Sequence, residues 1–214
     1  LHALSAYKGT LMSKTEYAEL ACKLEIDICK QPIGKQDQYA ASHGDFNILK
    51  FNPDHSVDIE KIIINEAIKY KLLQHMMVFY TGNTRSASSV LASQVNEISH
   101  PAKINLVKKM VSLVYPFRDS LLNGDFKLCG EILHENWILK KQLSKKVSNT
   151  EIDEIYRTAK ASGAIGGKLL GAGGSGFMMF IVKPENQIYV ERSLSKLKRV
   201  YWNFDESGTS IIYS

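Results

Sequence analysis

The feature that most constrains this chain is a glycine-rich segment at residues 163–176, G-A-I-G-G-K-L-L-G-A-G-G-S-G. Seven of its fourteen residues are glycine, and it leads directly into the apolar run F-M-M-F-I-V, which ends shortly before Pro184. Glycine allows φ > 0 and close approach of the backbone to another group, at a high cost in conformational entropy. The segment therefore predicts either a loop whose N–H groups cradle an anion or a tight connection between strands that packs against a helix.

Two common nucleotide-binding motifs do not fit this segment. A Walker A loop ending at Gly167-Lys168 would need a glycine in place of Ser162 and a hydroxyl residue in place of Leu169. A dinucleotide-binding fingerprint needs the order strand, glycines, helix, whereas these glycines precede a predicted strand. The sequence excludes both motifs and leaves the anion cradle and the packed connection as open alternatives.

Helical and strand patterns are interleaved along the chain, and they predict an α+β fold. Ser13 and Glu16 have the spacing of a capping box at the start of a helix. Connections are long and hairpins frequent, which favours α+β over a doubly wound parallel sheet. A shift in composition predicts a domain boundary near residues 65–72. The further predicted elements are strands over 46–51, 57–64, 72–81, 177–182, 199–204 and 209–213, a helix over 84–97, a helix from Pro101, and a helix capped by Thr150 with Asp153.

Composition and charge narrow the class of protein. The net charge of +5 is scattered, and its densest clusters, such as Lys140-Lys141, lie on predicted helix faces. We therefore expect solvated helix surfaces rather than a nucleic-acid site. The longest apolar run is far shorter than the roughly 20 residues of a membrane span. Three cysteines without metal or disulfide spacing, and no leader pattern, predict a cytoplasmic protein that binds neither nucleic acid nor membrane.

Two acidic residues in the first part of the chain are candidates for a functional site. Asp37 follows the helix-breaking stretch P-I-G-K-Q, in a loop-to-helix turn where a carboxylate can be aimed. Glu25 lies late in the preceding predicted helix, and its spacing alone indicates an ordinary surface carboxylate. The residues by themselves thus single out Asp37 and assign Glu25 to the surface.

These candidates lie in segments that resemble the GHMP kinases, a superfamily of small-molecule kinases. The first segment resembles the P-x-G-x-x-D-Q element of its sugar kinases, matched by Pro32, Gly34, Asp37 and Gln38. The glycine segment resembles the third motif of the superfamily, matched by Lys168, Leu169, Gly171, Gly173, Gly174, Ser175 and Gly176. The nearer resemblance is to bacterial D-glycero-D-manno-heptose 7-phosphate kinases. It extends through residues 80–88 and 134–141, and so covers nearly the whole chain.

The resemblance implies a fold and an activity. It implies the remainder of an N-terminal domain over residues 1–70 and a C-terminal domain of ferredoxin-like fold over residues 71–214. It also implies ATP-dependent phosphorylation of the anomeric hydroxyl of a sugar phosphate, with ATP as co-substrate and Mg²⁺ as cofactor. The alternatives are a kinase for an unphosphorylated sugar such as galactose or fucose, and a sugar sensor without turnover. The superfamily's phosphate-cradling motif would lie upstream of Leu1, so we expect a fragment that is inactive alone.

The same resemblance implies roles for individual residues. Asp37 is the expected catalytic base or orienting group, and Glu25 is the expected Mg²⁺ ligand. Lys35 and Arg85 are the expected substrate-binding residues. An ordinary surface arginine remains the alternative for Arg85, and Lys35 either contacts a substrate phosphate or steadies Asp37. The residues expected to bind nucleotide or phosphate are Gly171, Gly173, Gly174, Ser175 and Gly176.

Overall fold

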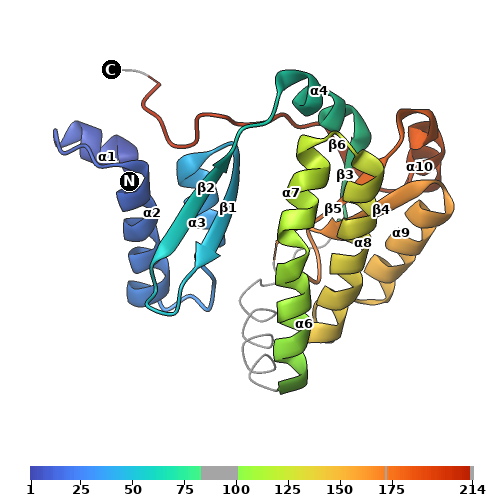
Figure 1. The fold of residues 1–214 in the computed structure, drawn as a ribbon, viewed down its shortest axis with the longest axis horizontal. Coiled ribbons are helices and arrows are strands. Elements are labelled where there is room, and N and C mark those ends of the chain that lie inside the picture. Colours follow the sequence, from blue (N-terminus) through green and yellow to red (C-terminus); the bar gives the residue numbers. More distant parts are fainter. Residues whose placement is uncertain (83–100, 172, 213–214) are drawn as a thin grey trace. The chain divides into compact units, whose positions relative to one another are not determined.

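The computed structural model describes residues 1–82, 101–171 and 173–212, and the chain divides into two compact units (Figure 1). The first unit comprises Leu1–Ile63 with Asn203–Ser214, and the second comprises Ile64–Trp202. The division lies near the expected boundary at residue 70, but it assigns the end of the chain to the first unit. The predicted helix over 84–97, which includes Arg85, lies outside the described residues. None of the described helices combines the length and the apolar character needed to cross a membrane.

The first unit combines helices with a two-stranded antiparallel hairpin. Its helical elements are α1 (His2–Tyr7), α2 (Lys14–Cys22), the π-helix η1 (Lys23–Ile28) and α3 (Gln36–His43), and its strands are β1 (Phe46–Phe51) and β2 (Val57–Ile62). The predicted capping box is present, because Ser13 and Glu16 each accept the other's backbone N–H. The strands pair with Phe46 opposite Ile62 and Phe51 opposite Val57.

A small apolar core holds the first unit together. The buried side chains of Ala18 and Cys22 from α2 and Tyr39 from α3 form its centre. Ile26 from η1 and apolar residues of the hairpin pack against them. The last residues of the chain join this unit through backbone hydrogen bonds, such as that from the Asp45 N–H to the Asp205 carbonyl at 2.8 Å. Helix α3 thus rests on the same core that orients α2 and η1.

The second unit is a four-stranded antiparallel sheet covered by helices. Its elements are α4 (Glu66–His75), β3 (Met76–Tyr80), α6 (Pro101–Ser112), α7 (Val114–Leu122), α8 (Phe126–Leu143), α9 (Thr150–Ala161), β4 (Ala164–Leu169), β5 (Phe177–Val182), the 3₁₀-helix η2 (Pro184–Asn186), α10 (Gln187–Ser193) and β6 (Lys198–Val200). The strand order is β4-β5-β3-β6. With helices between β3 and β4 and between β5 and β6, this is the β-α-β-β-α-β arrangement of a ferredoxin-like fold. The expectations of an α+β fold and of a ferredoxin-like second unit are confirmed.

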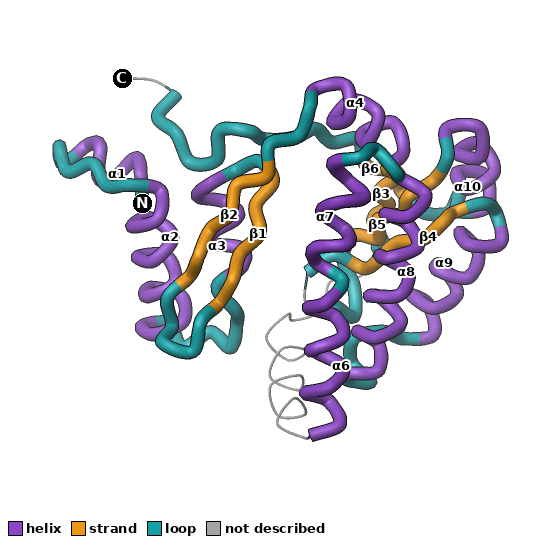
Figure 2. The backbone as a smooth tube through the Cα atoms, viewed as in Figure 1, coloured by secondary structure: helices purple, strands orange, loops and turns teal. Residues whose placement is uncertain are grey.

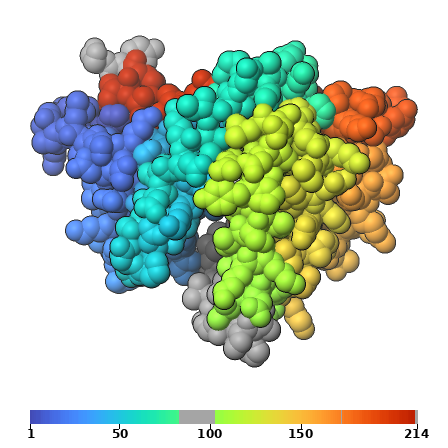
Figure 3. Space-filling model, in the orientation of Figure 1, coloured from blue at the N-terminus to red at the C-terminus, as the bar shows by residue number. Residues whose placement is uncertain are grey.

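Helices α8 and α9 both pack on the sheet, and α6 and α7 run end to end alongside α8 (Figures 1 and 2). In the space-filling view, α7 and α8 form one continuous green and yellow surface (Figure 3). The largest fully buried side chains come from both layers and include Trp137 of α8, Phe79 of β3 and Phe180 of β5. The core therefore fixes the last turns of α8 relative to β4, and this places the side chains described below.

Several predicted elements differ from the structure, each for a local reason. Residues 72–75 are helical rather than extended, because Asn65 accepts the Ala67 N–H and caps a helix that continues to His75. The cap of α9 is Asn149, which accepts the Ile152 N–H, rather than Thr150. The final strands are shorter than predicted: β6 ends at Val200, and residues 209–212 form no strand.

Candidate functional site

The glycine-rich segment is a strand followed by a tight loop. Residues 164–169 form β4, and residues 170–176 connect it to the antiparallel β5, with the Leu170 N–H donating to the Phe177 carbonyl at 2.8 Å. The loop glycines 171, 173, 174 and 176 have φ values of 75°, 116°, 80° and 118°. Residues with a side chain rarely adopt these values. The alternative of a packed connection between strands is therefore correct for the backbone, and it leaves open what the loop binds.

The loop is anchored on both sides by hydrogen bonds. The Gly174 N–H donates to the Val147 carbonyl at 2.9 Å, and the Asn149 side chain donates to the Gly174 carbonyl at 2.9 Å. Thr81, at the end of β3, donates its N–H to the Gly176 carbonyl at 2.9 Å and accepts the Gly176 N–H at 3.0 Å. The amides of Gly174 and Gly176 are thus occupied within the protein. Those of Gly171 and Gly173 have no acceptor in the described part of the chain.

Two lysines lie at the start of this loop. Lys140, in the last turn of α8, donates from Nζ to the Gly171 carbonyl at 2.8 Å. Burial, together with the positive charge of Lys168 on β4, lowers the pKa of Lys140 to about 8. Burial also lowers the pKa of Lys168. No ion pair joins either ammonium group to a carboxylate of the described residues.

Sequence reasoning missed this feature, because it assigned Lys140-Lys141 to a solvated helix face. Only Lys141 behaves as an ordinary surface cation, with an ion pair to Asp153 at 2.9 Å. Lys140 lies three residues after the buried Trp137 and three residues before the buried Leu143. Positions three apart share a helix face, so this spacing was the available signal that Lys140 points toward the core side of α8.

In the first unit, Glu25 and Asp37 lie on neighbouring elements linked by Gln38. Glu25 is exposed on η1, where the Cys29 N–H donates to the Leu24 carbonyl at 2.8 Å. The Gln38 side-chain amide donates to one carboxylate oxygen of Glu25. Asp37 is exposed in the first turn of α3, where the helix dipole favours a negative charge. Isolated π-helical turns occur often at functional sites, which makes this pair of carboxylates a candidate site.

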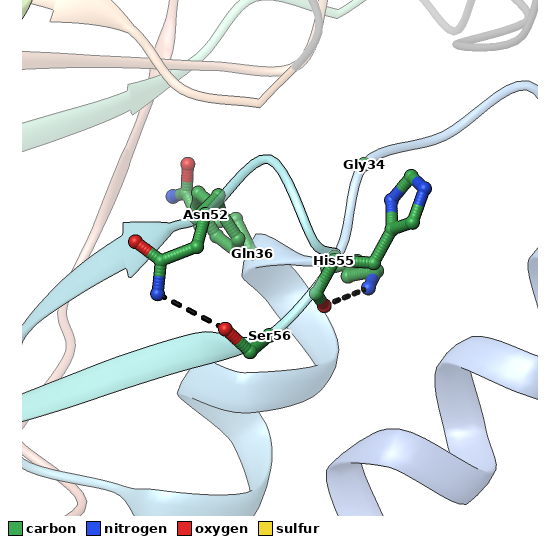
Figure 4. A pocket seen from close by; sticks show the side chains of 7 residues that line it. Gly34, Gln36, Asn52, His55 and Ser56 are labelled. Atoms are coloured by element: carbon green, nitrogen blue, oxygen red, sulfur yellow. Dashed lines mark hydrogen bonds between the residues drawn. The ribbon is translucent and has the colours of Figure 1, made fainter.

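Lys35 does not steady Asp37 in this structure. Its Nζ donates to the backbone carbonyl of His55 at 2.8 Å. Lys35 and His55 both line two cavities of the first unit, of about 350 and 520 Å³. In the smaller cavity, Asn52 donates to Ser56 at 3.1 Å, and the His55 imidazole points away from that pair (Figure 4). Lys35 is therefore placed beside a space that can hold a small ligand.

Residues 117–201 match the family described as GHMP kinases C terminal. A D-glycero-alpha-D-manno-heptose 7-phosphate kinase of Campylobacter jejuni is 29% identical over 196 residues, which are 92% of this chain and 58% of that protein.

Two solved structures of kinases are similar to this chain. A D-glycero-D-manno-heptose 1-phosphate kinase from Bacteroides thetaiotaomicron has a TM-score of 0.69 at 25% identity, over 100% of this chain and 60% of that one. A galactokinase from Lactococcus lactis, solved with galactose, has a TM-score of 0.73 at 14% identity over 98% of this chain and 64% of that one, which is a likeness of fold. The chain thus spans 58% to 64% of the length of these relatives.

Proposed function

We propose that the full-length protein transfers a phosphoryl group from ATP to the anomeric hydroxyl of a sugar phosphate, with a heptose phosphate as the acceptor. The observation that carries this proposal is the similarity, over 92% of the chain, to a protein named as a heptose 7-phosphate kinase. The name of the Bacteroides relative also includes a heptose phosphate. The loop of positive-φ glycines and the exposed carboxylate of Asp37 are the two features of this chain that support the chemistry.

The protein takes little part in the covalent chemistry of this reaction. The acceptor oxygen attacks the terminal phosphorus of ATP, the bond to the ADP oxygen breaks, and the hydroxyl proton leaves to a base. Catalysis of such transfers is mainly positioning and stabilisation of charge. In our proposal Asp37 accepts or orients the hydroxyl proton. The path of the transferred phosphoryl group is lined by Gly171, Gly173, Gly174, Ser175 and Gly176. The phosphate of the acceptor is bound by Lys35 and Arg85.

The first unit is compatible with a Mg²⁺ ligand at Glu25. No group of three or more potential metal-binding side chains occurs among the described residues. Mg²⁺ at phosphoryl-transfer sites needs fewer, since it is usually held by one or two carboxylates together with substrate phosphates and water. The hydrogen bond from Gln38 leaves the second carboxylate oxygen of Glu25 available. When bound, Mg²⁺ would neutralise charge on the phosphates.

Replacing Glu25 with Gln should raise the Mg²⁺ concentration that gives half-maximal activity of the full-length protein by about tenfold or more. The reason is that loss of a ligand should weaken metal binding at least as much as loss of an outer-shell partner, which typically costs 10–100-fold. A Mg²⁺ titration of the initial rate at saturating ATP measures this. Asp27→Asn, which changes an exposed carboxylate two residues away, is the matched control. Identical titrations for the Glu25 variant and the wild type would assign Glu25 to the surface.

An acceptor panel tests the function itself. The full-length protein is incubated with ATP and, separately, heptose 7-phosphate, heptose 1-phosphate, galactose, fucose or mevalonate, and ³¹P NMR identifies the product. We expect turnover with heptose 7-phosphate. Turnover only with an unphosphorylated sugar would replace the acceptor, and sugar binding without turnover of any acceptor would favour a sensor.

Arg85 offers a separate test of a phosphorylated acceptor. Arg85→Ala should weaken binding of heptose 7-phosphate by about 1.5–3 kcal/mol, the usual range for hydrogen bonds to charged groups. Binding of the unphosphorylated heptose should hardly change. Calorimetry with both ligands measures the difference, and equal weakening of the two would remove Arg85 from the acceptor phosphate.

A further inference from the structure

Lys140 and Lys168 form an unusual arrangement in the second unit, because two like charges share a partly buried position. One side chain comes from the last turn of α8 and the other from β4, and the charge of Lys168 acts on Lys140. Partly buried cations are normally paired with carboxylates or hydrogen-bonded. Here only Lys140 has a hydrogen-bond partner among the described residues, and that partner is a neutral carbonyl.

Three other cations of the second unit have carboxylate partners. Lys141 is paired with Asp153 at 2.9 Å, Arg199 with Glu191 at 2.8 Å and Lys69 with Glu66 at 3.2 Å. Lys141 is the direct neighbour of Lys140, and its partner Asp153 also accepts the Ser148 hydroxyl at 2.9 Å. Asp153, the carboxylate that pairs with the neighbouring Lys141, is therefore already engaged. No carboxylate of the described residues pairs with Lys140 or Lys168, so their positive charge is left for a bound group.

The pair has a fixed position relative to the glycine loop. The 2.8 Å hydrogen bond holds the Lys140 ammonium group at Gly171, the first loop residue with positive φ. A lysine ammonium has three donors, so within the described residues two remain on Lys140 and all three remain on Lys168. The amides of Gly171 and Gly173, which have no acceptor among the described residues, add donors in the same loop. The arrangement offers several N–H donors and two positive charges to one small anion.

We propose that Lys140 and Lys168 together bind one phosphate group, carried either by the nucleotide or by the phosphorylated acceptor. A phosphate dianion matches the charge of two ammonium groups, and lysine binds phosphate as a compact point charge. The choice of the nucleotide and the phosphorylated acceptor as the two possible carriers of this phosphate rests on the proposed function. The phosphate site itself lies within the second unit. The site lies beside Gly171, at the start of the loop that follows β4. The phosphate would therefore contact loop residues whose backbone is held in the left-handed region.

Binding measurements on charge-removing variants test the proposal. Lys140→Met and Lys168→Met keep the unbranched stem and remove the ammonium group, and Lys141→Met is the matched control with a paired charge. Calorimetry on the full-length protein compares ATP, adenosine and heptose 7-phosphate. We expect each test variant to weaken binding of ATP or of heptose 7-phosphate by about tenfold or more, with adenosine binding unchanged. Lys141→Met should leave all three affinities near the wild-type values.

The outcome separates the sources and the alternatives. Weakening confined to ATP assigns the phosphate to the nucleotide, and weakening confined to heptose 7-phosphate assigns it to the acceptor. Unchanged affinities for both phosphate ligands would overturn the proposal and leave Lys140 as a tether of the loop. Equal weakening of adenosine and ATP would also overturn it, because a general loss of structure would then explain the effect. Turnover plays no part in these measurements, so a failed kinase assay leaves their result intact.

A second readout follows the lysine proton directly. By NMR of ¹³C-labelled lysine, Lys140 should titrate near pH 8, and the bound phosphate should move this midpoint to higher pH because an anion stabilises the protonated form. The charged groups near Lys140 in the described residues are Lys168 from β4 and the adjacent Lys141, which is already paired with Asp153 from α9. A midpoint that is the same with and without the phosphate ligand would contradict the proposal.

Discussion

Replacing Asp37 with Asn in the full-length protein should lower kcat by about 10²- to 10⁴-fold, the usual contribution of a general base. Asparagine keeps the size of the side chain and its place in the first turn of α3, but it can no longer take a proton. The Asp37 carboxylate is exposed, so the substitution should leave the core of the first unit intact. Steady-state rates at saturating ATP and heptose 7-phosphate measure the effect.

Two controls show whether the effect of Asp37→Asn on kcat is specific. Asp58→Asn removes an exposed carboxylate on β2 that pairs with Lys50 at 3.5 Å, and it should leave kcat near the wild-type value. The dissociation constant of ATP should be nearly the same for Asp37→Asn and wild type, since Asp37 is proposed to act on the acceptor. If Asp37→Asn retains normal turnover, the base is another group and the proposed role of Asp37 is wrong.

Sequence reasoning succeeded where the structure depends on local contacts. The capping box at Ser13 and Glu16 involves residues three apart, so its pattern could be read directly. The start of α4 depends on a similarly local contact, the cap at Asn65, but the apolar run that begins at Leu72 predicts one strand. The helix ends at His75 and the strand begins at Met76 without a glycine or proline between them. No residue type marked that boundary.

The candidate site shows the same limit. The motif around Asp37 and the glycine loop were visible in the sequence, because each lies within a few residues. The contacts of Lys35 and Lys140 were not, because one reaches a carbonyl twenty residues away and the other a carbonyl thirty-one residues away. Such contacts depend on how hairpins and helices pack, which periodicity in a single sequence does not encode.

The second large expected effect is on the stability of the second unit, and it comes from a glycine of β4. Gly166→Ala should lower the free energy of unfolding of the second unit by about 3 kcal/mol or more, at or beyond the upper end of typical overpacking. A Cβ at residue 166 would lie 1.9 Å from the carbonyl oxygen of Gly130 on α8. That obstacle is backbone, so no side-chain rotation relieves it, and α8 would have to move away from β4. Chemical denaturation monitored by the fluorescence of the buried Trp137 measures the change.

Gly171→Ala is the comparison that separates packing from backbone strain. Residue 171 has a φ of 75°, and a Cβ there would meet no atom within 4 Å. The expected loss is therefore only the strain of a left-handed residue, about 1–2 kcal/mol. If Gly166→Ala is the milder of the two, then α8 does not approach β4 as closely as this structure has it. In that case the position of Lys140 beside the glycine loop, which depends on the same contact between α8 and β4, would also have to be revised.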